Sequence, residues 1–380
     1  MGETKPWMTP VGRGFDSSLG YLSGGEDHYT QLQKSVGIFG CVGIDLYKSD
    51  APAYGYNGTY AAYIYGAEGE RLIAAHDPLA GPLFIYFASQ VMHAPQEVPA
   101  VFSDLYPQPK YDTDYAIMNG MASAADQVLG NTTRALKDRG MWENTLLIYT
   151  SDNGGPAGQA SSGHSGNNFP LRGGKTNFFE GGIRVASFVS GGIIPQRMRG
   201  QTLSGYIHVC DWYPTMLGLA GGDPADDHPG LPAVDGMDMW PYLSGNATAS
   251  PRTQMMIGTE AFGDTKATWN GALISGDFKL ILGTQTYGFW TGPVYPNATT
   301  NHSAELPFEC NGGCLFNIQD DPSEYTDLAT SNPAKLKEMH DLFVQLNATT
   351  FEAAKSLVDP AKCEAYVNTH GGFLGPWDLS

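Results

Sequence analysis

The sequence is poor in positive charge and has no long hydrophobic run. Of its 380 residues, 21 are Lys or Arg and 39 are Asp or Glu, which gives a formal net charge of −18. Proteins that bind nucleic acid present a basic face, which this composition disfavours. No stretch approaches the roughly 18 uninterrupted apolar residues of a membrane-spanning helix. We therefore expect no nucleic-acid partner and no membrane span, and an anionic substrate has to be held by a local group of cations.

The N-terminal stretch also lacks the apolar core of a signal peptide. Six Asn-x-Ser/Thr sequons nevertheless favour a glycoprotein of the secretory pathway, lysosomal or extracellular, although sequons also occur by chance in cytosolic proteins. They lie at Asn57, Asn131, Asn246, Asn297, Asn301 and Asn347.

Cysteine is scarce, with five residues in the chain. Cys310 and Cys314, in the sequence ECNGGC, are close enough for a disulfide across a Gly-Gly turn, and two free thiols in a loop are the alternative. No second Cys pair or His pair stands at zinc-ligand spacing. Cys363 has no evident partner, and we expect that partner to have been lost with an N-terminal segment.

Strand-like and helix-like segments alternate in the central part of the chain. Residues 82–90 (PLFIYFASQ) and 144–151 (NTLLIYTS) are apolar runs of strand length, and helical spacing of apolar residues spans 114–140 between them. Strand, helix and strand form a βαβ unit with parallel strands. A further buried strand is predicted over 181–192 and a helix over 207–222. This pattern predicts an α/β fold, with a mostly parallel sheet between helices.

The pattern changes after about Pro251. Two short strands joined by a Gly-Asp turn are predicted over 271–284 and another strand over 314–318, followed by a helix over 332–347. That helix has an apolar face made of Leu336, Met339, Leu342, Phe343 and Leu346. We therefore expect an α/β domain over 1–250 and a smaller α+β subdomain over 251–380, with the boundary in 243–253.

Polar residues follow two of the predicted parallel strands, where α/β proteins bind their ligands. His93 follows the first strand, and Asp152 and Asn153 follow the second, before two glycines. A carboxylate and an amide oxygen suit Ca²⁺ or Mg²⁺. The alternatives are a turn in which Asp152 and Asn153 bond to their own backbone, and a structural role for His93.

A loop rich in glycine and cations follows, NNFPLRGGKTNFFEGGIR. Its Arg172, Lys175 and Arg184 concentrate positive charge in an otherwise acidic chain, which suits the binding of an oxyanion. The alternatives are that Arg172 or Arg184 pairs with Glu180 and that Lys175 is a solvated lysine.

Several segments in order resemble the type I sulfatases of the alkaline-phosphatase-like superfamily, and most of all the arylsulfatase B group. They are RGFDSSLGYLSGGEDHYT, PLFIYFASQVMHAPQEVP, IYTSDNGG, the cationic loop, IHVCDWYPTMLGLAG, GDFKLI, LFNIQDDPSEYTDLA and GPW. The resemblance implies a sulfuric ester hydrolase that acts on a sulfated small molecule or glycan. A phosphatase or phosphodiesterase of the same superfamily is an alternative that the sequence PLRGGK…EGGIR disfavours.

The resemblance also implies roles for individual residues. Asp152 and Asn153 correspond to two ligands of a divalent cation, usually Ca²⁺, with Mg²⁺ possible. Lys175 corresponds to a catalytic residue that binds sulfate oxygens, and Arg172 is expected to assist it in binding substrate. His93 corresponds to a catalytic residue that contacts the sulfate or the leaving-group oxygen. Such a site would neutralise an anionic ester and supply a proton to the leaving alcohol.

One family feature is missing from the sequence. Type I sulfatases attack with formylglycine, made from the first residue of a C/S-x-P-x-R motif, and none of the five cysteines heads such a motif. The Ser-Pro-Arg at Ser250 has the wrong spacing, and the N-terminal Asp-Asp metal ligands are also absent. We therefore expect a truncated chain that hydrolyses no aryl sulfate by itself; a pseudoenzyme that binds sulfated glycans is the alternative.

Overall fold

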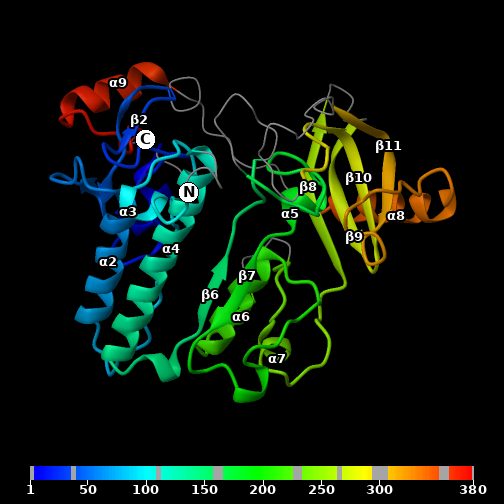
Figure 1. Ribbon diagram of the computed structural model, residues 1–380, viewed down its shortest axis with the longest axis horizontal. Helices are drawn as coiled ribbons and strands as arrows, with labels where there is room; N and C mark the ends of the chain where they lie inside the picture. The colour runs from blue at the N-terminus through cyan, green and yellow to red at the C-terminus, as the bar shows by residue number, and fades with distance from the viewer. Residues whose placement is uncertain are drawn as a thin grey trace. The chain divides into compact units, whose positions relative to one another are not determined.

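The computed structural model describes residues 4–35, 40–107, 113–156, 166–225, 233–262, 268–292, 307–350 and 359–378. Its helices and strands confirm a mixed α/β protein (Figure 1). The chain forms two compact units, one of residues 1–142 and 353–380 and the other of residues 143–352. This division differs from the predicted one, since residues 143–250 and 251–352 belong to the same unit. A subdomain boundary near residue 250, inside the second unit, stays a prediction.

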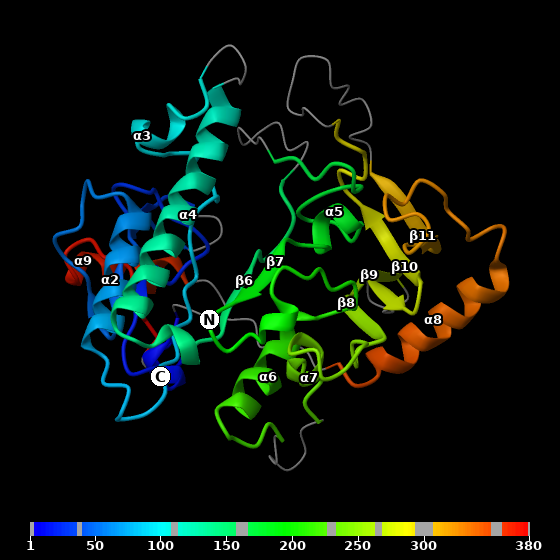
Figure 2. The same ribbon diagram turned by 60° about the horizontal axis from the view of Figure 1, so that its bottom comes forward.

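Two helices that lie side by side dominate the first unit, α2 (Ala61–Ala75) and α4 (Thr113–Asp138) (Figures 1 and 2). Gly66 of α2 lets Val128 of α4 approach closely, because an added Cβ would lie 3.2 Å from a Val128 methyl group. Met121 and Ala124 of α4 are buried as well. The helix predicted over 114–140 is therefore confirmed, and the apolar spacing marks the buried face. A short helix, α3 (Ala100–Ser103), packs against α4.

Short strands and a disulfide complete the first unit. The strands are β1 (Leu19–Gly20), β2 (Leu32–Gln33), β3 (Gly43–Ile44), β4 (Tyr47–Lys48) and β5 (Ala51–Pro52), and α9 (Pro360–Thr369) follows from the C-terminal end of the chain. Cys363 of α9 forms a disulfide with Cys41, 322 residues earlier. The expectation that Cys363 has no partner is therefore wrong, because the fold returns the C-terminal segment to the first strands.

The second unit begins with a two-stranded ladder of β6 (Leu147–Thr150) and β7 (Ser187–Ser190). Both strands lie where the sequence predicts strands, yet they pair antiparallel and β7 is exposed or half-buried rather than buried. The predicted strand 82–90 forms no ladder with any described residue. Its Phe84 and Tyr86 are 56% and 65% exposed, unlike residues of a central strand. The parallel βαβ unit is therefore not observed in the described part of the chain.

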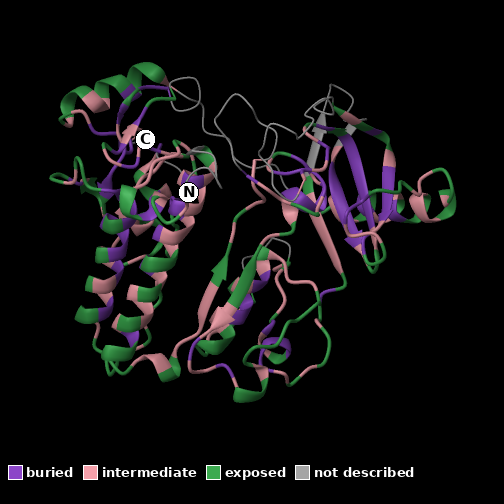
Figure 3. Ribbon diagram, in the orientation of Figure 1, coloured by how far each residue is buried: buried purple, intermediate pink, exposed green. Residues whose placement is uncertain are grey.

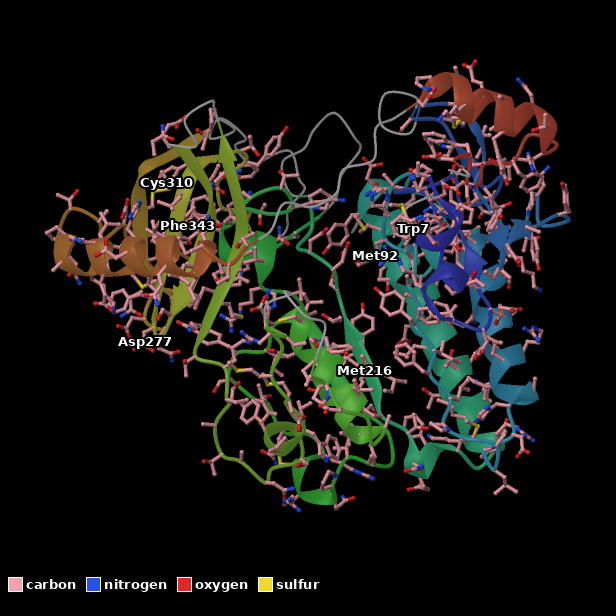
Figure 4. All side chains as sticks on the ribbon, turned by 180° about the vertical axis from the view of Figure 1, so that it is seen from behind. Trp7, Met92, Met216, Asp277, Cys310 and Phe343 are labelled. Carbon is pink, nitrogen blue, oxygen red and sulfur yellow. A yellow bond between two sulfur atoms is a disulfide. The ribbon has the colours of Figure 1, made fainter. Side chains whose placement is uncertain are left out.

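The predicted C-terminal elements form a four-stranded antiparallel sheet in the order β11-β10-β9-β8. The strands are β8 (Gln254–Phe262), β9 (Thr268–Ser275), β10 (Phe278–Gln285) and β11 (Phe308–Asn317). The turn at Gly276 and Asp277 joins β9 to β10 as predicted. Cys310 and Cys314 form the expected disulfide within β11. Figure 4 labels Asp277 at its turn and Cys310 on its strand.

Helix α8 (Pro333–Asn347) packs on one face of this sheet, and its Phe343 belongs to the same buried cluster as Leu280 and Leu282 of β10. Ile281, which points to the opposite face, packs with Phe179 from the loop before α5 (Glu180–Ile183). Side chains alternate between faces of a strand, so β10 is buried on both sides (Figure 3). The cationic loop thus packs against the sheet through Phe179.

The remaining helical segments are short. They are α6 (Trp212–Leu219), predicted from its sequence, α7 (Trp240–Leu243), and 3-10 turns at Pro6–Met8, Val11–Arg13, Trp142–Asn144, Gln196–Met198 and Val209–Asp211. No helix in the described part of the chain is long and apolar enough to cross a membrane.

Candidate active site

The turn after β6 presents the two predicted cation ligands. The ladder extends to Ser151, whose N–H donates to the carbonyl of Ala186, so Asp152 is the first residue beyond it. Asp152 Oδ1 accepts a 2.8 Å hydrogen bond from the N–H of Asn153, and Asn153 Nδ2 donates to the carbonyl of Gly154. Among the described residues, Asp152 Oδ2 and Asn153 Oδ1 accept no hydrogen bond. The turn is thus bonded to itself and still leaves one oxygen of each side chain for a ligand.

The glycines of this turn allow two backbones to approach each other closely. Gly154 N–H donates a 2.9 Å hydrogen bond to the carbonyl of Gly182 in α5. A Cβ added at Gly154 would lie 1.7 Å from the carbonyl oxygen of Gly181, so no other residue fits there without displacing α5. Gly181 N–H in turn donates 2.7 Å to the carbonyl of Arg172. The turn that carries Asp152 and Asn153 is therefore packed against the loop that carries Lys175.

Asn168 joins the two segments directly. Its Oδ1 accepts from the N–H of Gly155 at 2.9 Å, and its Nδ2 donates to the carbonyls of Gly155 and Gly173 at 2.9 and 3.0 Å. The N–H of Lys175 also donates to the carbonyl of Gly155, at 3.1 Å. The backbone of Lys175 therefore lies beside the end of the Asp152 turn. Sequence reasoning missed Asn168; only an amide can both donate and accept in this way.

Lys175 is half-buried, and its ammonium group forms no ion pair within the part of the chain that the structure describes. The backbone of Lys175 thus lies beside the turn that carries Asp152 and Asn153 in the second unit. His93 belongs to the first unit, where its Nδ1 lies 2.8 Å from the carbonyl of Ala94 and its carbonyl lies 3.0 Å from His28 Nε2. The ring of His93 is exposed. Its place relative to Lys175 stays a prediction.

Arg172 is on the cationic loop, yet its side chain is buried and only 4% exposed. Its Nε and Nη1 donate to the carbonyls of Gly288 and Glu324, at 2.8 and 3.2 Å. The guanidinium also packs on three aromatic rings, among them Phe179 at 3.9 Å. Burial lowers the pKa of Arg172 to about 10, which leaves it cationic at neutral pH. The Arg172 side chain is thus engaged with the backbone and aromatic rings of its own unit, and its contact with sulfate stays a prediction.

The alternative pairing of Glu180 is only partly correct. Arg184 lies 3.8 Å from Glu180, whereas Arg172 does not pair with it. The main partner of Glu180 is Lys279 of β10, with Nζ 3.0 Å from Oε1. Lys279 also contacts Glu324 at 2.8 Å, and Glu324 accepts from the N–H of Glu180. Burial raises the pKa of Glu324 while Lys279 opposes the shift. This buried cluster fixes the start of α5, and no pattern in the sequence indicates it.

The donor atoms of the turn fit a hard divalent cation in kind, because a carboxylate and an amide oxygen are typical Ca²⁺ and Mg²⁺ ligands. Their number is small. The described residues contain no cluster of three or more His, Cys, Asp or Glu side chains that could hold a metal ion. Asp152 and Asn153 can therefore contribute two ligands to a coordination sphere that needs about six to eight.

Comparison with known proteins assigns this chain to a family. The family model for sulfatases matches residues 4–222, more than half of the chain. The chain belongs to the sulfatase family. Members of this family generally use a divalent cation, in keeping with the oxygen donors of the Asp152 turn. The predicted membership is confirmed; the finer assignment to the arylsulfatase B group stays a prediction.

Individual sulfatases are similar over much of this chain. It is 33% identical to mouse (Mus musculus) arylsulfatase J over 97% of its own length and 61% of that protein. It is 28% identical to human (Homo sapiens) arylsulfatase A over 75% of its length and 54% of that protein. The crystal structure of Ps i-CgsB superimposes with a TM-score of 0.71 at 23% identity, over 98% of this chain and 74% of that one. The chain thus spans 61% and 54% of the length of these two curated relatives. The structural likeness confirms the fold.

Proposed function

We propose that this chain carries the cation-binding and sulfate-binding part of a sulfuric ester hydrolase. The observation that carries the proposal is the packing of the Asp152 turn against the Lys175 loop, through Asn168 and Gly154. Family membership supports the same reaction class. Asp152 and Asn153 supply two oxygen ligands to a divalent cation, for which Ca²⁺ is the expected ion.

The chemistry follows from the charge of the substrate. A sulfate ester is an anion, so nucleophilic attack on sulfur requires that its oxygens be neutralised. A bound divalent cation supplies Lewis acidity and positive charge. Lys175 adds a second positive charge and binds a sulfate oxygen. His93 contacts the leaving-group oxygen and delivers the proton that the departing alcohol requires, as a histidine can near neutral pH.

A sulfated glycan is the proposed substrate class. One structural neighbour with this fold, Ps i-CgsB, has been crystallised in complex with k-i-k-neocarrahexaose. Lys175 carries a positive charge in a chain whose net charge is −18. A single local cation of this kind suits the recognition of one anionic group on a larger, otherwise uncharged molecule.

The two disulfides support a protein of an oxidising compartment. Cys41–Cys363 and Cys310–Cys314 are structural bonds of the kind found in secreted and lysosomal proteins. The sequon residues Asn57 and Asn246 are exposed, whereas Asn297 and Asn301 lie outside the described residues. We therefore propose passage through the secretory pathway.

Binding of 4-nitrocatechol sulfate, measured with and without Ca²⁺, tests the proposal. We expect binding to depend on Ca²⁺. We also expect Lys175→Ala to weaken it by tenfold or more, because the variant removes the positive charge that faces the sulfate group. Lys337→Ala is the matched control, because Lys337 is an exposed lysine paired with Asp341 on α8. Equal binding of sulfate ester and free 4-nitrocatechol, or equal effects of the two lysine variants, would contradict the proposal. Release of 4-nitrocatechol in the same assay reports hydrolysis.

A further inference from the structure

A cavity of about 380 Å³ lies in the second unit, next to the cationic loop. Its lining combines aromatic rings with two charged groups: Arg172, Phe289, Trp290, Phe308, Tyr325 and Asp327. The loop and the cavity are joined through the backbone, since Arg172 bridges to Trp290 and the N–H of Gly173 donates to the carbonyl of Phe289 at 2.8 Å. A mostly apolar cavity with a few placed polar groups is the usual form of a small-molecule site.

Arg172 offers an unused donor to this cavity. Its Nε and Nη1 donate to backbone carbonyls, but Nη2 has no acceptor among the described residues. The guanidinium centre is held 4.3 Å from the Trp290 ring and 4.1 Å from the Phe308 ring. A hydrogen bond from a charged donor is stronger than one between neutral groups. A ligand oxygen in the cavity would therefore gain a hydrogen bond from a group that is already fixed in place.

The aromatic wall is also fixed and partly open. Trp290 and Tyr325 stack with ring centres 4.7 Å apart and planes 13° apart. Trp290 is held by a hydrogen bond from Nε1 to the carbonyl of Ser323, at 2.6 Å. Tyr325 is 63% exposed, so much of the outer ring remains uncovered. A flat aromatic face of this kind matches the C–H face of a pyranose ring and costs little entropy on binding.

The carboxylate of Asp327 favours a ligand without negative charge. Its Oδ1 accepts from the N–H groups of Leu315 and Ala329, and in the described part of the chain Oδ2 accepts no hydrogen bond. A carboxylate at the rim repels a sulfate or carboxylate group, but it accepts well from a hydroxyl group. One donor, one acceptor and an aromatic platform together suit a neutral sugar.

We propose that this cavity binds a neutral hexose unit of an oligosaccharide, with the sugar ring stacked on Tyr325. A sugar hydroxyl donates to Asp327 Oδ2, and another sugar oxygen accepts from Arg172 Nη2. The proposal extends the proposed function by assigning the unsulfated part of the glycan to a separate cavity, and it rests on that function only for the sulfated glycan as substrate. The cavity would bind an unsulfated part of the glycan while Lys175, three residues after Arg172 on the same loop, binds the sulfate.

Binding of neutral hexasaccharides of glucose, galactose or N-acetylglucosamine to the full chain tests the proposal, with tryptophan fluorescence and calorimetry as readouts. We expect at least one of them to bind, and Tyr325→Ala to weaken that binding by about tenfold, while Tyr325→Phe stays within about twofold. Tyr213→Ala is the matched control, because Tyr213 is a half-exposed tyrosine of α6 that does not line the cavity. It should leave the affinity unchanged.

Either of two outcomes overturns the proposal: no hexasaccharide of the panel binds to the native chain, or Tyr325→Ala and Tyr213→Ala have equal effects. Failure here is distinguishable from failure of the proposed function. Asp152→Asn should abolish the Ca²⁺-dependent binding of 4-nitrocatechol sulfate and leave the binding of the neutral hexasaccharide intact, because Asp152 does not line the cavity.

Discussion

Lys279 Nζ lies 3.0 Å from Glu180 Oε1, and both side chains are buried. The pair connects β10, a middle strand of the four-stranded sheet, to the first residue of α5, and the Asp152 turn packs against α5. Lys279→Met should lower the free energy of unfolding by about 3–5 kcal/mol, because it leaves Glu180 and Glu324 as buried carboxylates without their cation. Urea denaturation of the purified variant measures this loss.

The control for Lys279→Met is Lys337→Met. Lys337 and Asp341 also form an ion pair, at 2.6 Å, but their side chains are 76% and 62% exposed. Solvent screens such a pair, so the control should lose no more than about 1 kcal/mol. Similar losses in the two variants would show that the buried cluster has no special part in stability.

Gly154→Ala tests the close approach of the Asp152 turn to α5. The added methyl group would lie 1.7 Å from the carbonyl oxygen of Gly181, so one of the two backbones has to move. We expect Ca²⁺-dependent binding of 4-nitrocatechol sulfate to weaken by at least tenfold, because the ligand oxygens shift away from Lys175. Gly218→Ala in α6 is the control, since nothing lies within 4 Å of its added Cβ. It should bind like the native chain and gain up to about 1 kcal/mol of stability.

Local sequence patterns predicted the helices and the C-terminal strands well, because these depend on the spacing of apolar residues. The face of α8 with Met339 and Phe343 and the turn at Asp277 are examples. The pattern of residues 82–90 predicted a buried parallel strand, but an apolar run does not identify the backbone that pairs with it. Whether such a segment joins a ladder depends on partners far away in the chain.

Sequence reasoning predicted roles for Asp152, Asn153 and Lys175 but not the contacts that join their two segments. Asn168 bonds through its side chain to the backbones of Gly155 and Gly173, and the N–H of Gly181 bonds to the carbonyl of Arg172. No periodic pattern in the sequence marks these contacts. Lys279 was missed for a related reason. Lysine is almost never fully buried without a partner, and its partners Glu180 and Glu324 are distant in the sequence. Such long-range pairs become visible only in the folded chain.

Asn168 provides a graded test of the link between the two segments. Asn168→Asp keeps an acceptor for the N–H of Gly155 but removes the donor to the carbonyls of Gly155 and Gly173. Asn168→Ala removes both. We expect both variants to fold and to lose affinity for 4-nitrocatechol sulfate in the presence of Ca²⁺, with the native chain binding best. Unchanged affinity in Asn168→Ala would mean that the loop is held by its other contacts alone.

Glu26 predicts a pH dependence of stability in the first unit. Burial raises its pKa to about 9, although a hydrogen bond from Tyr65, at 2.5 Å, opposes the shift. The unfolded chain releases this proton near pH 4.5, whereas the folded chain keeps it until about pH 9. The folded state is therefore favoured at low pH, and stability should fall between these values by at most about 1.4 kcal/mol per pH unit.

Glu26→Gln removes this ionisation while keeping a polar side chain of similar size. The variant should lose less stability than the native chain between pH 5 and pH 8, as measured by urea denaturation at each pH. Part of the slope should remain, because burial also raises the pKa of the neighbouring Asp45. Glu364→Gln, at an exposed position of α9 in the same unit, should keep the native pH dependence. A native slope in Glu26→Gln would mean that Glu26 is ionised in the folded chain, and that water or a cation reaches it.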